Sequence, residues 1–590
     1  MSKVRDAVLS YPKIKERLSS RPEDKEKILK CYDEIKGDYS AAMVKTVSTL
    51  IDGSFKHLYD GINFEVPKGM DLIKLTKENN VILVPNHQSH ADYVAMTYLL
   101  FKEHNLPVYV AGGINLNIFP IGNLFRKCGC FFIRRKFNSD ILYKLTFEAY
   151  VYALLSEGHV IEFFFEGGRS RTGKLLPPRY GLFQMLIEAH SQLPESSRKP
   201  LMFMPVSLAH EAVPEQKAHA KELRGAQKEA EHATQLFKLL KLFNKRLGTI
   251  HVRVNEGIVI DHKKISDIKN STQELAFDCF RAVGKGMPVT PASLLALVLL
   301  DEPAGALTWK RIEENAFEVI NFCNKFDIPV SESLRGDKVA NSLQRALDIM
   351  ITNKKVQIVE KEKLGLIYYV IKPEARVEVL YFKNMILHHF LVPCFMNAAW
   401  WNMFRGNIKT ANGLTKFLIS KNKELKYEFY LPETREMINL ALRIISEAIG
   451  RKVENLAEAF NFTPQELFQI ASMVKRFSTA FTHIYETYYI GCMTLKHLAV
   501  EQFNSERFLQ VAKDIFELER VHGRIVKYSE SYTVPHLKST LEYFMKMGVI
   551  EKNLGKYKVV DLKKIDGMIE HFAQELNDQI TFNLKVSGTN

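Results

Sequence analysis

The sequence predicts an α/β domain, with helices covering a central mixed sheet, between a helical N-terminal segment and a mainly helical C-terminal region. Between residues 71 and 288, short apolar runs alternate with helical patterns, whereas helical periodicity prevails on either side of this stretch. A chain of 590 residues is long enough for two to four domains, each with its own core. We therefore predict boundaries at residues 1–70, 71–288 and 289–590.

The N-terminal segment is predicted to be helical because its apolar residues recur every three or four positions. The stripe at residues 43–62 shows this spacing, with Lys45, Asp52 and Lys56 lying off it. We expect this helix to pack on the domain that follows. The alternative is that it lies flat on a membrane surface.

Six short apolar runs in the middle of the chain are predicted strands, and helical patterns separate several of them. The runs are residues 81–84, 108–111, 130–133, 160–165, 201–208 and 250–254, and the helical patterns are residues 91–103, 140–155 and 181–190. The charged stretch at residues 215–246 is predicted to be a solvated helical excursion.

Thr290-Pro291 is a predicted N-cap with proline at the first helical position, and it opens the C-terminal region. Residues 343–369 and 537–559 each read as a helix followed by a hairpin, which resembles pieces of a winged helix. We expect packing modules rather than DNA readers here, because no helix rich in Arg and Asn accompanies them.

Composition narrows the class of partner. A formal charge of +14 favours anionic partners, but no RNA- or DNA-binding signature accompanies it, so we expect no nucleic-acid partner. Seven scattered cysteines without a CxxC pair argue for a reducing compartment and against a zinc site. We find neither a signal-peptide pattern nor an apolar run of about 18 residues, so no spanning helix is predicted.

The segment 86–92 carries the first chemical signal, a histidine with a carboxylate five residues later. His87 is expected in the turn after a buried strand, and Asp92 in the first turn of the next helix. The ring can then fold back so that Nδ1–H meets the Asp92 carboxylate and Nε2 acts as a base. His90 is a rival base, but on the helix it would point elsewhere.

Two arginine clusters follow. Arg134 and Arg135 end a predicted strand, and because alternate strand residues face opposite ways, one of the two can turn inward to bind a phosphate. Arg169 and Arg171 lie in the glycine-rich turn 166–173, where both can offer planar donors to an oxyanion. Glu166 could orient these guanidinium groups. The spacing does not fit a P-loop.

These segments, in this order, resemble the glycerolipid acyltransferases. Residues 111–117, 129–135 and 166–173 are similar to the bacterial-type, membrane-associated glycerol-3-phosphate 1-O-acyltransferases. The resemblance is strong over residues 38–210 and looser beyond them, as at residues 381–384.

The resemblance implies transfer of a fatty acyl group from acyl-CoA or acyl-carrier protein to the sn-1 hydroxyl of glycerol 3-phosphate, giving lysophosphatidate. No cofactor or metal is needed. His87 would be the base and Asp92 would hold it. The implied phosphate-site candidates are Arg134, Arg135, Arg169 and Arg171, framed by Glu166, Gly167 and Ser170. Residues 204–207 fall in a hydrophobic block linked to the acyl-donor side.

Two departures from the family pattern leave alternatives open. The family often has Arg at the position of Gln88, and Ser or Cys at that of Asn86. The sequence Asn-His-Gln-Ser instead resembles the corresponding motif of lysophosphatidate acyltransferases, which are usually much shorter. The alternatives are acylation of dihydroxyacetone phosphate or of lysophosphatidate, or a non-catalytic lipid-binding protein.

The net charge also suits a membrane, because anionic lipids attract basic surface. We expect peripheral attachment to a cytoplasmic membrane face, the inner membrane if the source is bacterial. The candidate anchors are the stripe at residues 43–62 and the aromatic stretch 390–404, which contains Trp400 and Trp401.

Overall fold

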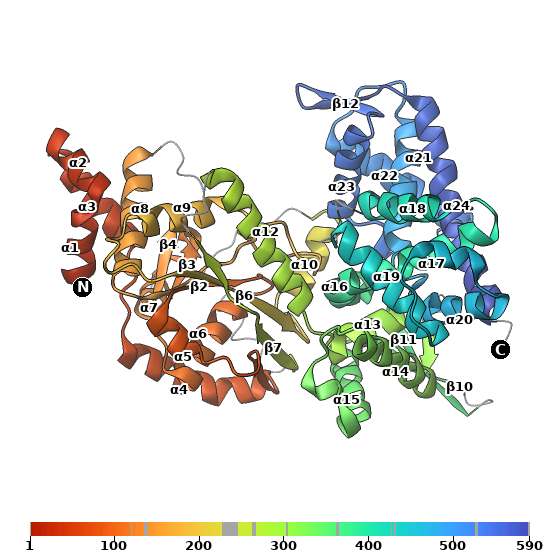
Figure 1. Cartoon of the computed structure of the whole chain (residues 1–590), viewed down its shortest axis with the longest axis horizontal. Coiled ribbons are helices and arrows are strands. Elements are labelled where there is room, and N and C mark those ends of the chain that lie inside the picture. The colour runs from red at the N-terminus through yellow and green to blue at the C-terminus, as the bar shows by residue number, and fades with distance from the viewer. Residues whose placement is uncertain are drawn as a thin grey trace. The chain divides into compact units, whose positions relative to one another are not determined.

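The structure is a computed structural model in which the chain forms two compact units, each described here by itself (Figure 1). The first unit comprises Met1–Ser170, Leu175–Pro214 and Glu229–Pro288, and the second comprises Arg171–Lys174, Glu215–Lys228 and Val289–Asn590. The residues described are 2–119, 121–134, 140–226, 246–261, 267–302, 305–361, 365–425, 428–429, 432–525 and 529–587.

The N-terminal segment is helical, as expected. Its helices are α1 (Ser2–Ser10), α2 (Pro12–Ser20), α3 (Asp24–Ile35) and α4 (Ala41–Leu58). Helices α1 and α3 pack on α8 (Ile141–Ser156), and α4 packs on α6 (Ala91–His104), so this segment belongs to the same unit as the sheet.

An eight-stranded mixed sheet forms the centre of the first unit, in the order β1-β7-β6-β2-β5-β3-β4 with β8 paired to β6. Neighbours among β2 to β6 run parallel, whereas β7 and β8 are antiparallel to β6. The strands are β1 (Gly61–Glu65), β2 (Asn80–Pro85), β3 (Val108–Gly113), β4 (Cys130–Ile133), β5 (Val160–Glu162), β6 (Leu201–His210), β7 (Thr249–Val254) and β8 (Ile258–Ile260).

All six predicted strands are present, with two additions. Strand β3 continues two residues beyond its predicted end, and β2 and β7 extend one residue past their predicted bounds. Strand β5 ends at Glu162 rather than at residue 165, where the chain turns out of the ladder, and β6 continues to His210, where it pairs with β7. Strands β1 and β8 were not predicted. Each lies at the margin of the sheet, where burial is incomplete and the apolar pattern is therefore weak.

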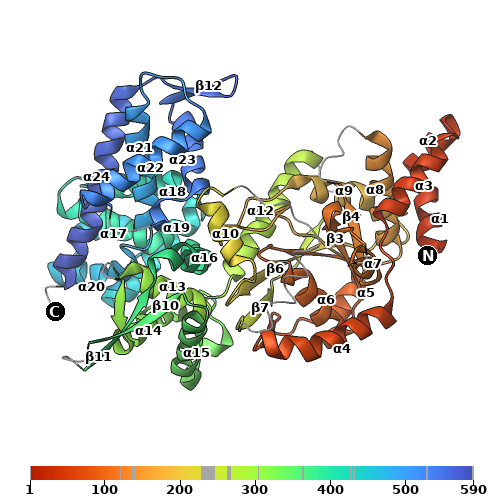
Figure 2. The ribbon, with the colours of Figure 1, turned by 180° about the vertical axis from the view of Figure 1, so that it is seen from behind.

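Helices cover both faces of this sheet, which gives three layers. Figure 1 shows α8, α9 and α12 on one face and α4, α5 and α6 on the other, and Figure 2 shows the same layers from behind. The further bounds are α5 (Leu72–Glu78), α7 (Ile121–Lys127), α9 (Tyr180–Ser191) and α12 (Ile268–Gly286). Asp71, Asp140 and Asp267 cap helix N-termini by accepting backbone N–H groups, which local sequence determines.

The second unit is mainly helical, as predicted. Thr290 caps its core helix α13 in a capping box with Ser293, which confirms the predicted N-cap. The helices are α10 (Gln216–Leu223), α13 (Pro291–Asp301), α14 (Trp309–Lys325), α15 (Val339–Thr352), α16 (Arg376–Ile386), α17 (Leu391–Phe404), α18 (Ala411–Glu424), α19 (Thr434–Ile449), α20 (Pro464–Val474), α21 (Thr482–His497), α22 (Ser505–Val521), α23 (Val534–Lys546) and α24 (Leu562–Ser587). Helices α21 and α24 pack side by side (Figure 2).

Both predicted pairings of a helix with a hairpin are present. Helix α15 precedes β10 (Val356–Lys361) and β11 (Leu366–Ile371), and β9 (Ala306–Thr308) joins the latter strand. Helix α23 precedes β12 (Ile550–Asn553) and β13 (Lys556–Val559). Short 3-10 helices occupy Ile114–Leu116, Glu332–Leu334, Gly336–Lys338, Pro373–Ala375, Leu387–Phe390, Leu456–Asn461, Lys475–Phe477 and Ser529–Ser531.

One helical run, Pro373–Phe404, has the length and composition of a membrane span among the described residues. Its most apolar 18-residue window is 89% buried inside the structure, as is typical of a core helix. Trp400 and Trp401 in this run are also buried. The predicted aromatic anchor at residues 390–404 therefore packs in the core of the second unit.

Candidate active site

The Asn86 side chain holds the turn after β2, because it bonds the backbone N–H and C=O of one residue on a neighbouring strand. The Asn86 amide donates to the carbonyl oxygen of Leu208 at 3.0 Å, and its oxygen accepts the backbone N–H of Leu208 at 2.7 Å. Asn86 is fully buried, and both bonds cross from β2 to β6. These two hydrogen bonds fix where the chain leaves the sheet and therefore where His87 lies.

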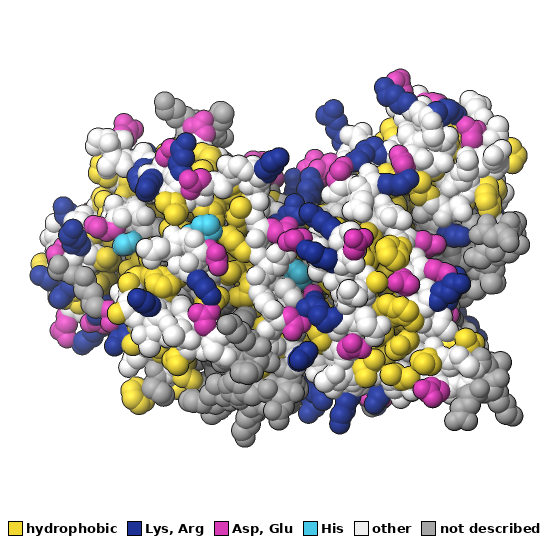
Figure 3. Space-filling model, turned by 90° about the horizontal axis from the view of Figure 1, so that it is seen from below, with side chains coloured by type: hydrophobic (Ala, Val, Ile, Leu, Met, Phe, Trp, Pro, Cys, Tyr) yellow, Lys and Arg dark blue, Asp and Glu magenta, His cyan; other side chains and the backbone are white. Residues whose placement is uncertain are grey.

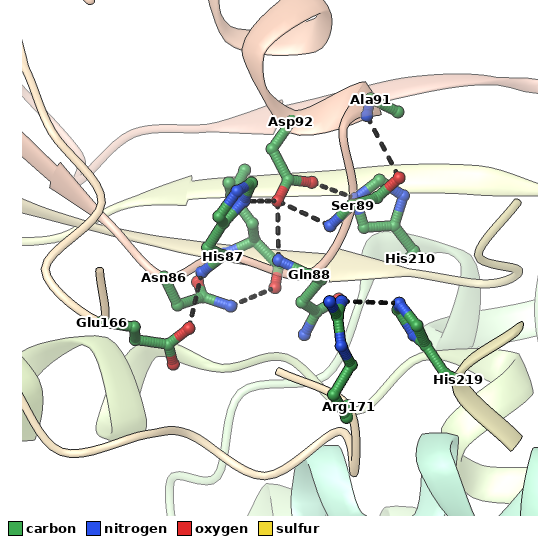
Figure 4. A network of polar contacts seen from close by, with 11 residues as sticks. Asn86, His87, Gln88, Ser89, Ala91, Asp92, Glu166, Arg171, His210 and His219 are labelled. Atoms are coloured by element: carbon green, nitrogen blue, oxygen red, sulfur yellow. Dashed lines mark hydrogen bonds and ion pairs between the residues drawn. The ribbon is translucent and has the colours of Figure 1, made fainter. Parts of the chain in front are cut away.

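The contact predicted between His87 and Asp92 is present (Figure 4). The His87 Nδ1 atom lies 2.9 Å from Asp92 Oδ2, and both side chains are buried. The same oxygen accepts the backbone N–H groups of Gln88 at 2.7 Å and Ser89 at 2.9 Å, so the carboxylate, in the first turn of α6, holds the loop that precedes this helix. His90 is buried too, but the histidines bonded to Asp92 are His87 and His210.

A second histidine contacts Asp92 from β6, and sequence reasoning missed it. His210 Nε2 lies 2.6 Å from Asp92 Oδ1, and the His210 side chain has no exposed surface. His210 is the last residue of β6, two positions beyond the predicted end of that strand. A longer strand prediction would have included it, but only the sheet order places it beside Asp92.

The hydrogen-bond partners of Asp92 keep its carboxylate ionised. Burial alone would raise the pKa of Asp92, but hydrogen bonds and charge from His210 and His87 outweigh it and hold that pKa below its usual range. Because an ionised carboxylate only accepts hydrogen bonds, Nδ1 of His87 carries the proton toward Asp92. A neutral His87 ring then has its lone pair on Nε2, which is the atom that a base needs.

Aromatic side chains pack on the His87 ring and lead to an apolar cavity. Phe164 lies against the ring with centroids 4.1 Å apart, and Tyr93 meets it edge-on at 5.2 Å. Tyr93 also lines a cavity of about 80 Å³ enclosed by α4, α6, α7, β3 and β4. The other lining residues include Val47, Leu124 and Cys130. Tyr93 therefore contacts both the His87 ring and this apolar cavity.

The glycine-rich loop after β5 is bonded to the His87 turn through the backbone. Glu166 accepts the N–H of His87 at 3.0 Å and the N–H of Leu176 at 2.9 Å, and the Ser170 N–H donates to the His87 carbonyl at 2.8 Å. Burial raises the pKa of Glu166 to about 8, although both backbone donors act to lower it. Glu166 thus holds the loop to the histidine turn, whereas the sequence suggested that it orients an arginine. Gly167 in this loop has φ +66°, a backbone conformation that favours glycine.

Carboxylates hold the guanidinium of Arg134, one of the pair of arginines from which the sequence predicts a phosphate ligand. Its Nε and Nη2 atoms bond both oxygens of Glu34 at 2.7 and 2.6 Å, and its Nη1 atom bonds Asp140 at 2.7 Å. The guanidinium also lies over the Tyr143 ring. Two carboxylates therefore occupy the donors that a phosphate would use. Arg135, its predicted companion, lies outside the described residues.

The remaining arginines lie on the loop itself. Arg169 is half-buried, and its charge acts to lower the pKa of the Tyr93 phenol, which burial raises. Arg171 belongs to the second unit, where its Nη1 atom lies 2.9 Å from His219 Nε2 and its Nε atom 3.1 Å from Glu222 (Figure 4 draws the histidine contact). Two residues apart in the chain, the Arg169 and Arg171 Cα atoms lie within about 7 Å of one another.

The hydrophobic block at residues 204–207 is an interior part of β6. Met204 and Val206 are buried in the core of the first unit. The Ser207 hydroxyl donates to the carbonyl of Val283 at 2.8 Å, which ties β6 to α12. Within the described part of the chain, we find no group of three or more His, Cys, Asp or Glu side chains that could hold a metal ion.

A family model described as "Acyltransferase" matches residues 69–209, the stretch that contains the His87–Asp92 pair. A second model, described as "Glycerol-3-phosphate acyltransferase C-terminal region", matches residues 219–553, which is more than half of the chain. The chain therefore belongs to the glycerol-3-phosphate acyltransferase family.

Curated relatives carry the same name over part of their length. "Glycerol-3-phosphate acyltransferase" of Pseudomonas aeruginosa (strain LESB58) is 30% identical over 386 residues, which is 62% of this chain and 45% of the relative. That of Pseudomonas fluorescens (strain SBW25) is 30% identical over 400 residues, 65% of this chain and 46% of the relative. The matched region thus spans slightly under half the length of these relatives. A solved 1-acyl-sn-glycerophosphate acyltransferase from Thermotoga maritima is 15% identical, covers 40% of this chain and 77% of its own, and has a TM-score of 0.23.

Proposed function

We propose that this protein is an enzyme that transfers a fatty acyl group from an acyl thioester to the sn-1 hydroxyl of glycerol 3-phosphate, giving lysophosphatidate. The observation that carries the proposal is the buried His87–Asp92 contact, with Nδ1 and Oδ2 2.9 Å apart. The names of the matching family and of the curated relatives support glycerol 3-phosphate as the acceptor.

His87 acts as a general base in this proposal. Its Nε2 atom takes the proton of the primary hydroxyl as the hydroxyl oxygen attacks the thioester carbonyl. The tetrahedral intermediate then collapses, the carbon–sulfur bond breaks, and the imidazolium returns the proton to the departing thiolate. Asp92 stays ionised throughout and stabilises the transient imidazolium. General base catalysis of this kind contributes about 10²–10⁴-fold, and positioning supplies much of the rest.

Arginines on the glycine-rich loop are proposed to bind the phosphate of the acceptor. Arg169 is the first candidate because the N–H of the next residue, Ser170, is bonded to the His87 carbonyl. Arg171, which is bonded to Glu222 and His219, and Arg135 remain predictions from the sequence. Arg134 is no longer proposed, since Glu34 and Asp140 occupy its guanidinium.

The apolar cavity beside Tyr93 is proposed to receive the fatty acyl chain of the donor. Its walls are almost entirely hydrophobic, and Tyr93 joins it to the His87 ring. A cavity of this kind favours an alkyl chain over water, because transfer of each CH₂ group out of water is worth about 0.8 kcal/mol. Both acyl-CoA and acyl-carrier protein carry such a chain on a thioester.

We also propose peripheral attachment to anionic lipid on a cytoplasmic membrane face, which is the inner membrane in a bacterium. Figure 3 shows a face on which Lys and Arg side chains are interspersed with Asp and Glu, so net charge alone is a weak guide there. A better guide is a group of exposed apolar side chains on two elements that line the cavity. Leu50 lies on α4, and Ile118, Phe119 and Leu124 lie at or just before α7.

An acyl-transfer assay with purified protein tests the function. Glycerol 3-phosphate, dihydroxyacetone phosphate and lysophosphatidate are each offered with labelled acyl-CoA and with acyl-carrier protein, and His87→Ala is the negative control. We expect turnover with glycerol 3-phosphate that the control lacks. Preferred turnover of another acceptor would reassign the substrate, and absence of turnover with every pair would favour a non-catalytic lipid-binding protein.

A further inference from the structure

The carboxylate that holds His87 is shared between two imidazole rings. Asp92 Oδ2 lies 2.9 Å from Nδ1 of His87, and Asp92 Oδ1 lies 2.6 Å from Nε2 of His210. The two histidines come from different strand ends, one after β2 and the other at the end of β6, and Figure 4 shows both rings directed at the carboxylate. Asp92 and His210 have no exposed surface.

Asp92 accepts four hydrogen bonds from described residues, three on Oδ2 and one on Oδ1. A carboxylate offers about four lone-pair positions. Asp92 Oδ2 accepts from His87 and from the backbone N–H groups of Gln88 and Ser89, and Oδ1 accepts from His210. Because the other three donors all reach Oδ2, His210 is the hydrogen-bond donor on Oδ1 among the described residues.

We propose that His210 is a positioning residue, which keeps the Asp92 carboxylate in one orientation and shares its negative charge, so that Asp92 fixes the His87 ring without binding its proton too tightly. This inference rests on the proposed function for its kinetic meaning. Without the His210 donor, Oδ1 would be a buried oxygen lacking a partner, which is costly. The carboxylate could then turn, and its whole charge would act on His87.

Other charged and titratable groups act on Asp92 and must be kept constant in any test. Glu162 on β5 and Glu166 after it both respond to the charge of Asp92, and burial and this charge raise the pKa of Glu162 to about 8. Tyr93 on α6 responds to Asp92, Glu162 and Arg169. Since none of these groups donates to Oδ1 in the described contacts, none replaces His210.

The test compares His210→Phe, which fills the space without a donor, with His210→Gln, whose amide can still donate to Oδ1. A matched control is His251→Phe. His251 is a buried histidine on β7, and its Nε2 atom lies 3.2 Å from Glu211 Oε1, so its described carboxylate partner is Glu211 and not Asp92. Each variant is first checked by circular dichroism and thermal unfolding, and His210→Met replaces His210→Phe if the latter does not fold.

In steady-state assays we expect kcat of the donor-free variant to fall about 10- to 100-fold, the range found when the partner that orients a functional histidine is removed. The KM values for acceptor and acyl donor should stay within about twofold, because His210 touches neither in this proposal. The acid limb of the pH–rate profile should move to higher pH by about one unit, since His87 keeps its proton more readily when Asp92 acts on it alone. His210→Gln should retain most of the activity, and His251→Phe should not shift the profile.

A wild-type profile in both His210→Phe and His210→Gln would overturn the proposal. So would equal losses in the Phe and Gln variants with an unshifted acid limb, which would indicate a packing role. A readout that needs no acyl transfer separates the inference from the proposed function. In ¹⁵N-histidine-labelled protein, the Nδ1 proton that His87 shares with Asp92 should shift or broaden in His210→Phe and persist in His251→Phe. An unchanged signal in His210→Phe would reject the inference, whichever acceptor the enzyme uses.

Discussion

At the residue scale, the role of each arginine depends on the carboxylates around it. Arg134 and Arg169 both follow buried strands and look equivalent in the sequence. In the folded chain Glu34 and Asp140 bond all three nitrogens of the Arg134 guanidinium, whereas Arg169 lies on the loop whose Ser170 N–H is bonded to the His87 carbonyl. We therefore separate Arg134, which has a structural role, from Arg169, which stays the proposed phosphate ligand.

This separation predicts different kinetics for two alanine variants. Arg169→Ala should raise KM for glycerol 3-phosphate by about 10- to 100-fold, because a hydrogen bond to a charged group is worth about 1.5–3 kcal/mol. KM for the acyl donor should change little. Initial-rate measurements with each substrate varied in turn would check both values.

Arg134→Ala is the matched comparison. It should lower the melting temperature, because it leaves Glu34 and Asp140 without their shared partner, yet leave KM for the acceptor nearly unchanged. If Arg134→Ala instead weakened acceptor binding as much as Arg169→Ala does, Arg134 would return to the phosphate site.

At the element scale, α4 has two different sides that the periodicity of its apolar residues did not distinguish. One side of the helix lines the cavity with Val44, Val47 and Ile51, as expected for a helix packed on the domain. The other side leaves Leu50 68% exposed. The prediction of a packed helix is confirmed for the lining side, and the exposed side remains a candidate for membrane contact.

Filling the cavity from α4 should change the choice of acyl chain. Val47→Trp places a larger side chain in the lining and should shift preference toward shorter acyl thioesters, measured by competition between chains of different length. Thr46→Trp is the matched control, because Thr46 is an exposed neighbour on the same helix that does not line the cavity. Identical chain preference in the Val47 variant and the wild type would rule out this cavity as the acyl site.

At the scale of the whole molecule, the chain consists of two compact units, and the glycine-rich loop passes from one to the other between Ser170 and Arg171. Residues 171–174 are held within the helical unit. There Lys174 forms a buried ion pair with Glu428, and Asn384 donates to the Thr172 carbonyl at 2.9 Å. Gly173 lies so close to the Tyr381 carbonyl that a Cβ atom would clash with it.

Liposome flotation tests the proposed membrane attachment of the whole protein. Phe119→Asp should reduce binding to vesicles that contain anionic lipid, because Phe119 is 85% exposed and burying such a side chain is worth about 1.5–3 kcal/mol. Val500→Asp, at a position 98% exposed in the other unit, is the control for the added charge. Equal losses in both variants would indicate a charge effect, and no wild-type binding would contradict peripheral attachment.

The sequence by itself determined the features that depend on near neighbours in the chain. Spacings of a few residues predict three features: the succession of strands and helices along the chain, the Thr290 cap, and the contact between His87 and Asp92. The contact succeeds as a prediction because a strand, a turn and a helix start confine residues five apart to one small region. The predicted role of Glu166 toward the arginines did not follow, because its backbone partners depend on how the loop folds.

Only the tertiary structure decided which distant groups meet. His210 is 118 residues from Asp92, and Glu34 is 100 residues from Arg134, so no short sequence pattern predicts either contact. The first pair forms because β6 lies beside β2 in the sheet. The second forms because α3 packs on β4. The order of strands within the sheet and the docking of helices are set by burial of whole apolar faces. Many residues share such a face, and no short segment specifies it.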